Sequence, residues 1–515
     1  MPGTPSRPPR ATRPDPTASD PAAAPAEGAA PAPAPGAAAA APAAGPALVP
    51  ISAPALTPPS APALSPVAAP ASGLIRLLAT TLGWVGLLAS AYRWAWNTDG
   101  SPRFMLDAWI YRHAVEQWHA GGSLYDWYAN PAEHLWPFTY PPFAAWTLTP
   151  LTWGGDRTAQ VLLTAATPVC AAMSAWATAR ALGVGQRRAL AAAPWLGLAG
   201  GILLEPIYKT MEYGQVNAIL MLLVAVDLLV VPARSRWRGV GTGLAAAFKL
   251  TPAIGVVLLL ARREWRAAAT MAGTAIGATA LCWLVRPEES SRFFFSAMLD
   301  PSRAGFADYA GNQNLKGAIA RWLPEQLWIP VWTAAVVVVA LGAWLLLRRL
   351  ETLRGPTSAQ AAPSTPSEFS GSSARTTPTP ATGAPQEGLI LTLQVTTAMV
   401  LGLLVSPITW SHHWVWCLPA LMTLTAAARR WRSPALAATA VAGLAVFGLA
   451  MQWWFPGQNH VEQEWPLWAT VVGSSYTWWA LAAGVVLWTA AGDSTARSRA
   501  RALSPAACPR EPAAP

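Results

Sequence analysis

Charged residues and cysteines are both scarce in this chain. Asp, Glu, Lys and Arg make up 12% of the 515 residues, whereas hydrophobic residues make up 53%, and soluble domains carry roughly twice that charged fraction. The composition therefore excludes an ordinary soluble globule. The cysteines lie far apart with no CxxC spacing, which argues against a disulfide framework and against a zinc site; they are Cys170, Cys282, Cys417 and Cys508.

The chain also lacks an apolar segment near its start. Its first 72 residues are mostly Ala and Pro with scattered Arg, a composition that cannot bury a core, so residues 1–72 are predicted to be a disordered tail. The first apolar stretch begins at about Leu74, too far along for a cleaved signal peptide, and it is predicted to remain as a membrane anchor. The net charge of +10 comes from Arg clusters between apolar stretches and in the tails, which favours membrane orientation over nucleic-acid binding.

Apolar stretches long enough to cross a bilayer recur along the rest of the chain. A helical span needs about 20 residues, and this requirement predicts an all-α integral membrane protein, a polytopic helix bundle of about ten to twelve spans. The candidate spans are residues 74–91, 161–177, 190–204, 216–231, 240–260, 267–285, 327–347, 389–406, 414–427, 436–451 and 468–491.

The candidate span 240–260 differs from the others because basic clusters flank it at both ends, and its centre contains Lys249 and Pro252. Proline removes a helix hydrogen bond, and irregular backbone inside a membrane is tolerated where it lines a cavity. We therefore predict a broken, re-entrant element, which leaves ten crossings. A plain crossing is the alternative, because the neighbouring Leu and Val residues offset most of the roughly 3 kcal/mol cost of inserting a lysine.

The Arg clusters also predict which loops lie on which side of the membrane. Loops rich in Lys and Arg stay in the cytoplasm, so both tails are predicted to be cytoplasmic and the long loop 93–157 to lie outside. The predicted organisation is a membrane domain over 73–354, a flexible cytoplasmic linker over 355–387, C-terminal membrane helices over 388–491 and a disordered tail over 492–515. The linker is rich in Pro, Ser, Thr and Ala, as flexible tethers are.

Polar residues in the first outer loops are candidates for chemistry. Asp107 heads a predicted amphipathic helix in an otherwise apolar and aromatic loop, which continues to Tyr140. The structural alternative for Asp107 is a helix N-cap. Gln215 and Asn217 stand at the start of a span, where an amide either caps the helix or faces a polar ligand.

Two later outer segments supply further candidates. Asn312, Asn314 and Lys316 are clustered amides and a cation, which suit sugar hydroxyls or a phosphate and equally suit an ordinary solvated loop. His412 and His413 occupy the turn between two spans. Adjacent residues of a helix diverge by about 100°, so the two histidines make a poor metal pair, and no metal site is predicted. One of them could donate to a phosphate, or the turn could be purely structural.

Seven short blocks in series resemble the polyprenol-phosphate-mannose-dependent mannosyltransferases of actinobacterial envelopes. That group includes α-(1,2)-mannosyltransferases that act on phosphatidylinositol mannosides and lipomannan. Each block is weak alone, but their order and spacing, which extend over residues 74–491, make the set fairly specific. The blocks are residues 107–111 (Asp-Ala-Trp-Ile-Tyr), 122–125, 138–142 (Phe-Thr-Tyr-Pro-Pro), 214–217 (Gly-Gln-Val-Asn), 243–252, 312–316 (Asn-Gln-Asn-Leu-Lys) and 406–414.

The resemblance implies a GT-C-type glycosyltransferase fold, in which a multi-span helical body carries juxtamembrane helices that frame a site on the outer, periplasmic face of the plasma membrane. It also implies inverting transfer of mannose from polyprenyl phosphate mannose to a glycolipid or lipoglycan, with an α-(1,2) linkage and without a cofactor or required metal. Within the first-loop catalytic segment 93–157, Asp107 matches the general base of the family. His412, His413 and Lys249 match residues around the donor phosphate. The remaining candidates for donor phosphate or sugar binding are Tyr140, Gln215, Asn217, Asn312, Asn314 and Lys316.

Elementary chemistry agrees with this assignment and leaves two alternatives open. Inverting transfer needs a base within about 3 Å of the acceptor hydroxyl, and cations can stabilise the leaving phosphate without a metal. A related enzyme that uses another polyprenyl-phosphate sugar, such as arabinose or glucose, is one alternative. A lipid or solute transporter is the other, although it should carry more ionisable residues inside its spans than Lys249 and Asp227 and should show internal repeats.

Overall fold

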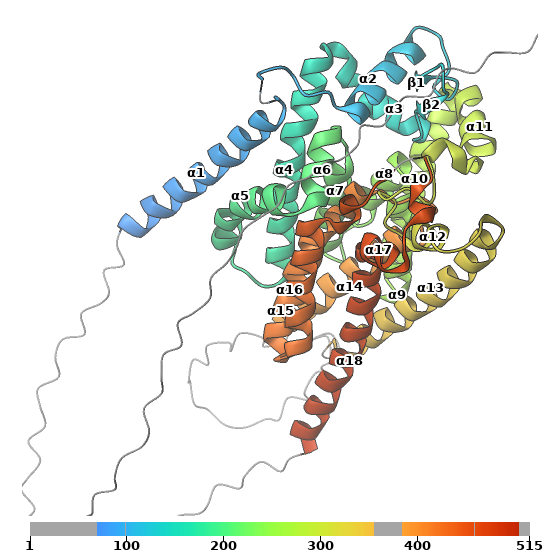
Figure 1. Ribbon diagram of the computed structural model, residues 1–515. Coiled ribbons are helices and arrows are strands. Elements are labelled where there is room, and N and C mark those ends of the chain that lie inside the picture. Colours follow the sequence, from blue (N-terminus) through green and yellow to red (C-terminus); the bar gives the residue numbers. More distant parts are fainter. Residues whose placement is uncertain (1–69, 98, 355–383, 458, 504–515) are drawn as a thin grey trace, which may run out of the picture. The chain divides into compact units, whose positions relative to one another are not determined.

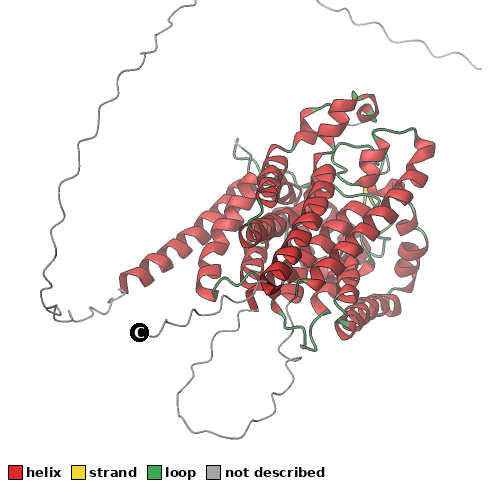
Figure 2. Cartoon of the chain, turned by 90° about the horizontal axis from the view of Figure 1, so that it is seen from below, coloured by secondary structure: helices red, strands yellow, loops and turns green. Residues whose placement is uncertain are grey.

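The computed structural model describes residues 70–97, 99–354, 384–457 and 459–503. Within these ranges the chain is helical almost throughout (Figures 1 and 2), and one antiparallel pair of short strands joins β1 (Tyr128–Asn130) to β2 (Leu135–Pro137). The predicted helical class is confirmed. Most of the predicted tails and linker, residues 1–69, 355–383 and 504–515, lie outside the described residues.

The helices fall before and after residues 355–383. Those before are α1 (Pro70–Trp94), α2 (Leu106–His119), α3 (Pro142–Leu148), η1 (Thr149–Trp153), α4 (Asp156–Ala181), α5 (Gln186–Leu203), α6 (Glu205–Tyr213), α7 (Asn217–Ala225), η2 (Val226–Val230), α8 (Val240–Phe248), η3 (Thr251–Ile254), α9 (Gly255–Ala261), α10 (Trp265–Val285), α11 (Pro287–Phe295), η4 (Ala297–Leu299), η5 (Pro301–Ala304), α12 (Leu315–Ala320), η6 (Glu325–Leu327) and α13 (Trp328–Thr352). Those after are α14 (Ala384–Val405), η7 (Ser411–Trp416), α15 (Cys417–Trp431), α16 (Pro434–Leu449), η8 (Met451–Trp454), η9 (Val461–Glu464), α17 (Leu467–Gly473) and α18 (Ser475–Leu503).

The last helix corrects one predicted boundary. α18 continues to Leu503, so the first part of the predicted disordered tail 492–515 is helical. The apolar run ends near residue 491, but the sequence that follows is rich in Ala and Arg, which both favour helix. A boundary drawn from hydrophobicity alone therefore ended the helix too early.

Several helices can cross a membrane. In the described part of the chain, α1, α4, α10, α13 and α14 are long and apolar enough to span a bilayer. The pairs α5–α6 and α17–α18 would each pass as one span, but they bend by 83° and 70° at their breaks. The predicted spans 216–231 and 436–451 form shorter apolar helices. The chain is a membrane protein with five to seven clear candidate spans among the described residues, and the count of ten crossings stays a prediction.

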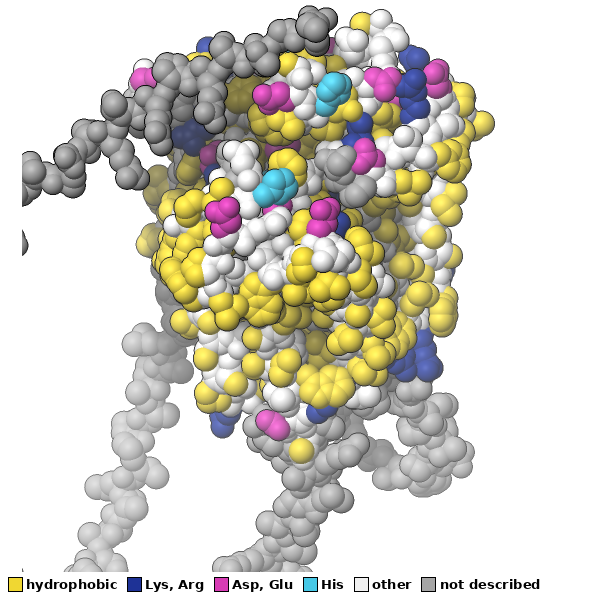
Figure 3. All heavy atoms as spheres, turned by 45° about the vertical axis from the view of Figure 1, so that its right-hand side comes forward, with side chains coloured by type: hydrophobic (Ala, Val, Ile, Leu, Met, Phe, Trp, Pro, Cys, Tyr) yellow, Lys and Arg dark blue, Asp and Glu magenta, His cyan; other side chains and the backbone are white. Residues whose placement is uncertain are grey.

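Apolar side chains cover the sides of the helices. Large hydrophobic residues on α1, α10 and α13 are exposed, among them Leu78, Ile276 and Val338, with exposed fractions of 53%, 68% and 69%. Figure 3 shows one face on which hydrophobic side chains predominate and charged side chains gather above and below them. This distribution is expected where hydrocarbon rather than water surrounds the middle of a protein.

The predicted break in residues 240–260 is confirmed. α8 ends at Phe248, and Lys249 leaves the helix with extended backbone angles, φ −147° and ψ 128°. The chain then makes the short 3-10 helix η3 at Pro252 and continues as α9. Because the backbone leaves the helix at Lys249, this lysine can extend away from its own helical surface toward α7 and η7.

A layer of short elements lies at one end of the bundle. Figure 1 shows α2, α3, β1, β2 and α11 together at the top of the view. α2 is tied to α4, because the Arg112 guanidinium donates to Asp156 at 2.8 Å, and α11 is tied to the loop after α2, because Glu289 accepts from the backbone N–H of Leu124 at 3.2 Å. These contacts hold α2 against α4 and the loop after α2 against α11.

Several of the Arg clusters predicted to be cytoplasmic meet in one network. Arg238, which is 2% exposed, and Arg262 donate to the two carboxylate oxygens of Glu264 at 2.6 and 2.7 Å. Glu351 lies 3.7 Å from Arg262 and also pairs with Arg354. Arg354 in turn pairs with Glu387 at 2.7 Å, so the network joins the two sides of residues 355–383. Buried charges need such partners because removal from water is costly. The network places these clusters together, as expected for loops on the same side of a membrane.

Candidate active site

Asp107 lies in the first turn of α2, and its carboxylate does not cap that helix. The N-cap position is Met105, which makes no side-chain capping hydrogen bond. The N-cap interpretation of Asp107 is therefore wrong. Its carboxylate instead accepts a hydrogen bond from the Gln215 side chain and is attracted by the charge of Lys249. Three segments far apart in the sequence thus meet at this carboxylate.

The surroundings of Asp107 tune its basicity. Although part of the residue reaches the surface, the carboxylate is packed among protein atoms, and this desolvation raises the pKa of Asp107 to about 6. The Gln215 hydrogen bond and the positive charge of Lys249 oppose part of that rise. Asp107 is therefore mostly ionised at neutral pH, and its pKa lies close to the value that suits a general base.

The turn between α6 and α7 presses against α2. Gly214 ends α6 with φ +66°, and a Cβ built on it would lie 2.6 Å from the Cβ of Ala108. Only glycine accommodates both the left-handed backbone and this close approach. The approach brings the next residue, Gln215, to Asp107. The helix α7 has Val216 at its N-cap without a side-chain hydrogen bond, so neither Gln215 nor Asn217 is a capping residue, and their amides bond to groups of other segments.

Lys249 is the centre of the second half of the site. Its ammonium donates to Asn217 Oδ1 at 3.0 Å and lies 3.1 Å from His413 Nε2. It also lies 5.3 Å from the centre of the Tyr140 ring, a cation–π contact. Because an ammonium has only donors to offer, His413 Nε2 accepts this hydrogen bond and its imidazole is neutral.

The His412–His413 turn is fixed by its backbone. The His412 carbonyl accepts from the Thr210 hydroxyl at 2.9 Å and from the Asn217 amide at 3.1 Å. The His412 ring is 6% exposed and meets the edge of the Tyr213 ring at 5.0 Å. Its Nε2 has no hydrogen-bond partner among the described residues. A buried nitrogen without a partner is unusual, and its hydrogen-bonding capacity is not used by the described residues.

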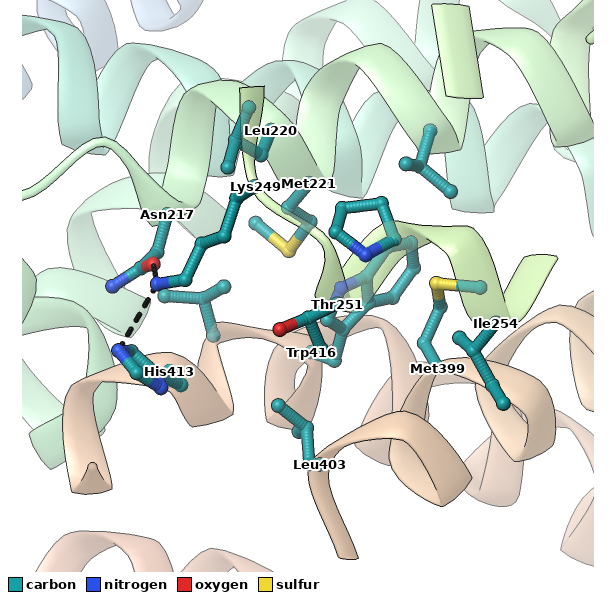
Figure 4. A pocket seen from close by; sticks show the side chains of 13 residues that line it. Asn217, Leu220, Met221, Lys249, Thr251, Ile254, Met399, Leu403, His413 and Trp416 are labelled. Carbon is teal, nitrogen blue, oxygen red and sulfur yellow. Dashed lines mark hydrogen bonds between the residues drawn. The ribbon is translucent and has the colours of Figure 1, made fainter. Parts of the chain in front are cut away.

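A pocket begins at Lys249 and continues between apolar side chains. Figure 4 shows Lys249 directed toward Asn217 and His413 at one end, with Thr251 and mainly apolar side chains around the rest of the cavity. Its volume is about 40 Å³, enough for only a few water molecules. The pocket thus joins a polar end to an apolar wall. The wall comes from α7, η3, α14 and η7 and consists of Leu220, Met221, Val224, Pro252, Ile254, Met399, Leu403, Val415 and Trp416.

Asn312, Asn314 and Lys316 do not line this pocket. Asn312 is buried and bonds to backbone groups, since its Oδ1 accepts from Thr409 N–H at 2.9 Å. Asn314 is the N-cap of α12, where its Oδ1 accepts from Gly317 N–H at 2.7 Å. Lys316 packs 5.6 Å from the ring centre of Trp332. The two asparagines hold loops in place, and Lys316 lies at the contact between α12 and α13.

Known proteins similar to this chain are described as glycosyltransferases. The sequence profile described as glycosyltransferase family 87 matches residues 138–363. A polyprenol-phosphate-mannose-dependent alpha-(1-2)-phosphatidylinositol mannoside mannosyltransferase of Mycobacterium tuberculosis is 32% identical over 80% of this chain and 91% of its own length. The protein of the same description from Mycolicibacterium smegmatis is 33% identical over 80% of this chain and 90% of its own length.

The chain belongs to glycosyltransferase family 87. The resemblance predicted from the seven sequence blocks is confirmed, and the protein is a glycosyltransferase. A phosphatidylinositol pentamannoside mannosyltransferase of Mycolicibacterium smegmatis is also similar, with 30% identity over 68% of this chain and 77% of its own length. No solved structure matches the chain.

The structure of this family 87 enzyme also shows a buried carboxylate to which the sequence analysis gave no role. Glu205, at the start of α6, is fully buried and accepts from the Ser411 hydroxyl at 2.7 Å, the Trp453 indole at 2.8 Å and the Tyr476 hydroxyl at 3.0 Å. It therefore anchors η7, which carries His412. In the sequence, only the position of this acidic residue between two apolar stretches could have drawn attention to it. Within the described ranges, no three His, Cys, Asp or Glu side chains cluster as metal ligands.

Proposed function

We propose that this glycosyltransferase moves mannose from polyprenyl phosphate mannose to a glycolipid or lipoglycan hydroxyl, with inversion and an α-(1,2) linkage. The observation that carries the proposal is a carboxylate, Asp107, that feels the charge of Lys249, together with the placement of that lysine at the polar end of an apolar pocket. The similar mycobacterial proteins are described as mannosyltransferases dependent on polyprenol-phosphate-mannose. We extend that donor to this enzyme.

The bond changes assign a distinct task to each half of the site. The acceptor oxygen attacks the anomeric carbon, the bond from that carbon to the phosphate oxygen breaks, and the hydroxyl proton passes to Asp107. Polyprenyl phosphate leaves with the electron pair of the broken bond. Since inversion to an α product requires a β-linked donor, the base and the leaving phosphate lie on opposite sides of the sugar. A base with a pKa of about 6 is suited to accept this proton near neutral pH.

Lys249 and His412 are the groups proposed to meet the donor phosphate. The ammonium of Lys249 is held by Asn217 and His413, so its position is fixed before substrate arrives. Fixed donors stabilise charge that develops on a leaving group without having to reorganise. The buried, unpartnered Nε2 of His412 supplies a second contact. Tyr140 offers a ring face for the sugar beside Lys249.

The apolar wall of the pocket is proposed to contact the isoprenoid units nearest the phosphate. Leu220, Ile254, Met399 and Leu403 present only hydrocarbon and thioether surface, which suits a polyprenyl chain. The cavity of about 40 Å³ is too small for a mannosyl phosphate. Donor binding therefore requires the side chains around the cavity to move, and methionine side chains such as Met399 adapt readily to such a change.

We place the site on the outer, periplasmic face of the plasma membrane, with both tails in the cytoplasm. The grouping of Arg238, Arg262 and Arg354 in one network supports this orientation, because basic loops favour the cytoplasm. A long-chain donor must keep its tail in lipid while its phosphate sits at headgroup level, and a site in the layer above the membrane helices satisfies both conditions. Cysteine labelling at position 99, in the exposed turn before α2, distinguishes the two orientations; cytoplasmic labelling contradicts the proposal.

The test is a transfer assay with the purified enzyme in lipid vesicles. Radiolabelled polyprenyl phosphate mannose is supplied with a phosphatidylinositol mannoside acceptor, and the linkage of the product is determined. Asp107→Asn, which keeps the size and loses the base, should lower kcat by at least about 100-fold. Normal rates for this variant contradict the assigned base. Transfer only from a donor carrying arabinose or glucose replaces mannose in the proposal, and donor movement across the bilayer without transfer favours a transporter.

A further inference from the structure

A chain of hydrogen bonds leads from two tyrosines to the proposed base. The Tyr111 hydroxyl donates to Gln215 Oε1 at 2.7 Å, and the Tyr140 hydroxyl donates to the same oxygen at 3.2 Å. The two hydroxyl oxygens are 2.9 Å apart. The Gln215 side chain is in turn hydrogen-bonded to Asp107. Four side chains from three segments therefore form one connected group.

The tyrosines and the carboxylate together determine which way the Gln215 amide faces, since an ionised carboxylate only accepts hydrogen bonds whereas a tyrosine hydroxyl can donate or accept. A carboxamide has one end that accepts and one end that donates. Because both hydroxyls donate to Oε1, this oxygen is turned away from Asp107 and the NH2 group donates to the carboxylate. Tyr111, Tyr140 and Gln215 are 0%, 8% and 4% exposed, so water has little access to replace a lost partner.

We propose that Tyr111 and Tyr140 are positioning residues for catalysis, which fix the Gln215 amide so that its NH2 group holds one oxygen of Asp107 and leaves the other oxygen to accept the proton of the acceptor hydroxyl. This inference rests on the proposed role of Asp107 as base. A rotated amide would place Oε1 against the carboxylate, and the repulsion between the two would displace Asp107.

The same group connects the two halves of the site. The Tyr140 ring faces Lys249 at 5.3 Å, while its hydroxyl binds Gln215. Lys249 is attracted to Asp107. A single tyrosine thus contacts both the cation proposed for the leaving phosphate and the amide that holds the base.

Other titratable groups on the surrounding elements have to be considered in any pH measurement. From α6, Tyr213 feels the charge of Asp107. From α4, Asp156 approaches α2 but is paired with Arg112 and His113 at 2.8 and 3.0 Å. From the break after α8, Lys249 stabilises ionised Asp107. The proposed variants leave all of these residues in place, so a change in the pH profile reports on the amide.

The experiment measures kcat/KM against pH for Tyr111→Phe, Tyr140→Phe and the double variant, in the transfer assay described above. The Gln215 hydrogen bond lowers the pKa of Asp107. The acid limb of the profile is the pH range in which kcat/KM falls because Asp107 becomes protonated, and losing the hydrogen bond should move this limb to higher pH. We expect Tyr111→Phe to reduce kcat roughly tenfold with acceptor KM unchanged, Tyr140→Phe to have a smaller effect because its hydrogen bond is longer, and the double variant to exceed either.

Tyr476→Phe is the matched control. It removes an equally buried tyrosine hydroxyl, which donates to Glu205 instead of Gln215, and its acid limb should not move. Gln215→Glu retains an acceptor for the tyrosines but has no NH2 group, and it should give the largest displacement even if Tyr111→Phe folds poorly. Unchanged acid limbs in the tyrosine variants, or an equal displacement in the control, overturn the inference. If Asp107→Asn keeps full activity, the proposed base itself is wrong. If Asp107→Asn is inactive but the acid limbs of the tyrosine variants do not move, only the positioning role of the tyrosines is rejected.

Discussion

Replacing Lys249 by methionine should separate the stabilisation of the leaving phosphate from the work of the base. Methionine is one atom shorter but equally unbranched and flexible, and it removes the charge and the donors. In the structure this ammonium is held by Asn217 and His413 and stands over Tyr140. The variant therefore loses a preorganised cation at the polar end of the pocket while the apolar wall is kept.

The size of the effect follows from the strength of one hydrogen bond to a charged group. Such a bond contributes about 1.5–3 kcal/mol, and since 1.36 kcal/mol is a factor of ten, kcat/KM should fall about 10- to 150-fold. A second effect has a definite sign. The charge of Lys249 lowers the pKa of Asp107, so its removal raises that pKa, and the acid limb of the profile should move upward from about pH 6.

Steady-state transfer from labelled donor at several pH values measures both effects. Lys249→Arg is the control for charge, because it keeps the cation while changing its shape; the acid limb should stay near its original position even if the rate falls. Lys249 does not stabilise the leaving phosphate if Lys249→Met retains activity within about threefold of the unchanged enzyme, and its charge does not act on Asp107 as described if the acid limb of the variant moves to lower pH.

Two further predictions concern glycine and asparagine at fixed backbone positions. Gly214→Ala places a Cβ 2.6 Å from that of Ala108 at φ +66°, so it should displace the start of α2 and reduce the rate of transfer at least tenfold. The donor KM shows whether the pocket lining is also disturbed. Full activity of this variant argues against the importance of the contact. Asn314→Ala removes the N-cap of α12 and should lower the free energy of unfolding by about 1 kcal/mol; thermal unfolding in detergent measures this, and a changed acid limb would instead place Asn314 in the active site.

The sequence by itself determined the features that depend on local composition. The length of the apolar segments predicts helices such as α4 and α14, because a segment that crosses a bilayer must satisfy its backbone hydrogen bonds internally, as a helix does. The break at Lys249 follows from Pro252, three residues further on, which has a purely local effect on helix hydrogen bonding. The family likewise followed from short blocks whose order is preserved along the chain.

Only the tertiary structure decided how the site is built. The site combines four separate segments, which contribute Asp107, Gln215, Lys249 and His413. The pattern of apolar residues in the sequence does not show that Gly214 lets α6 approach α2 closely enough to bring them together. The sequence also does not distinguish the roles of the amide side chains. Gln215 bonds to the proposed base, whereas Asn312 accepts a hydrogen bond from the backbone N–H of Thr409. A polar side chain has similar local preferences in both settings, and the partner that satisfies it is fixed only when packing removes water and brings distant segments into contact.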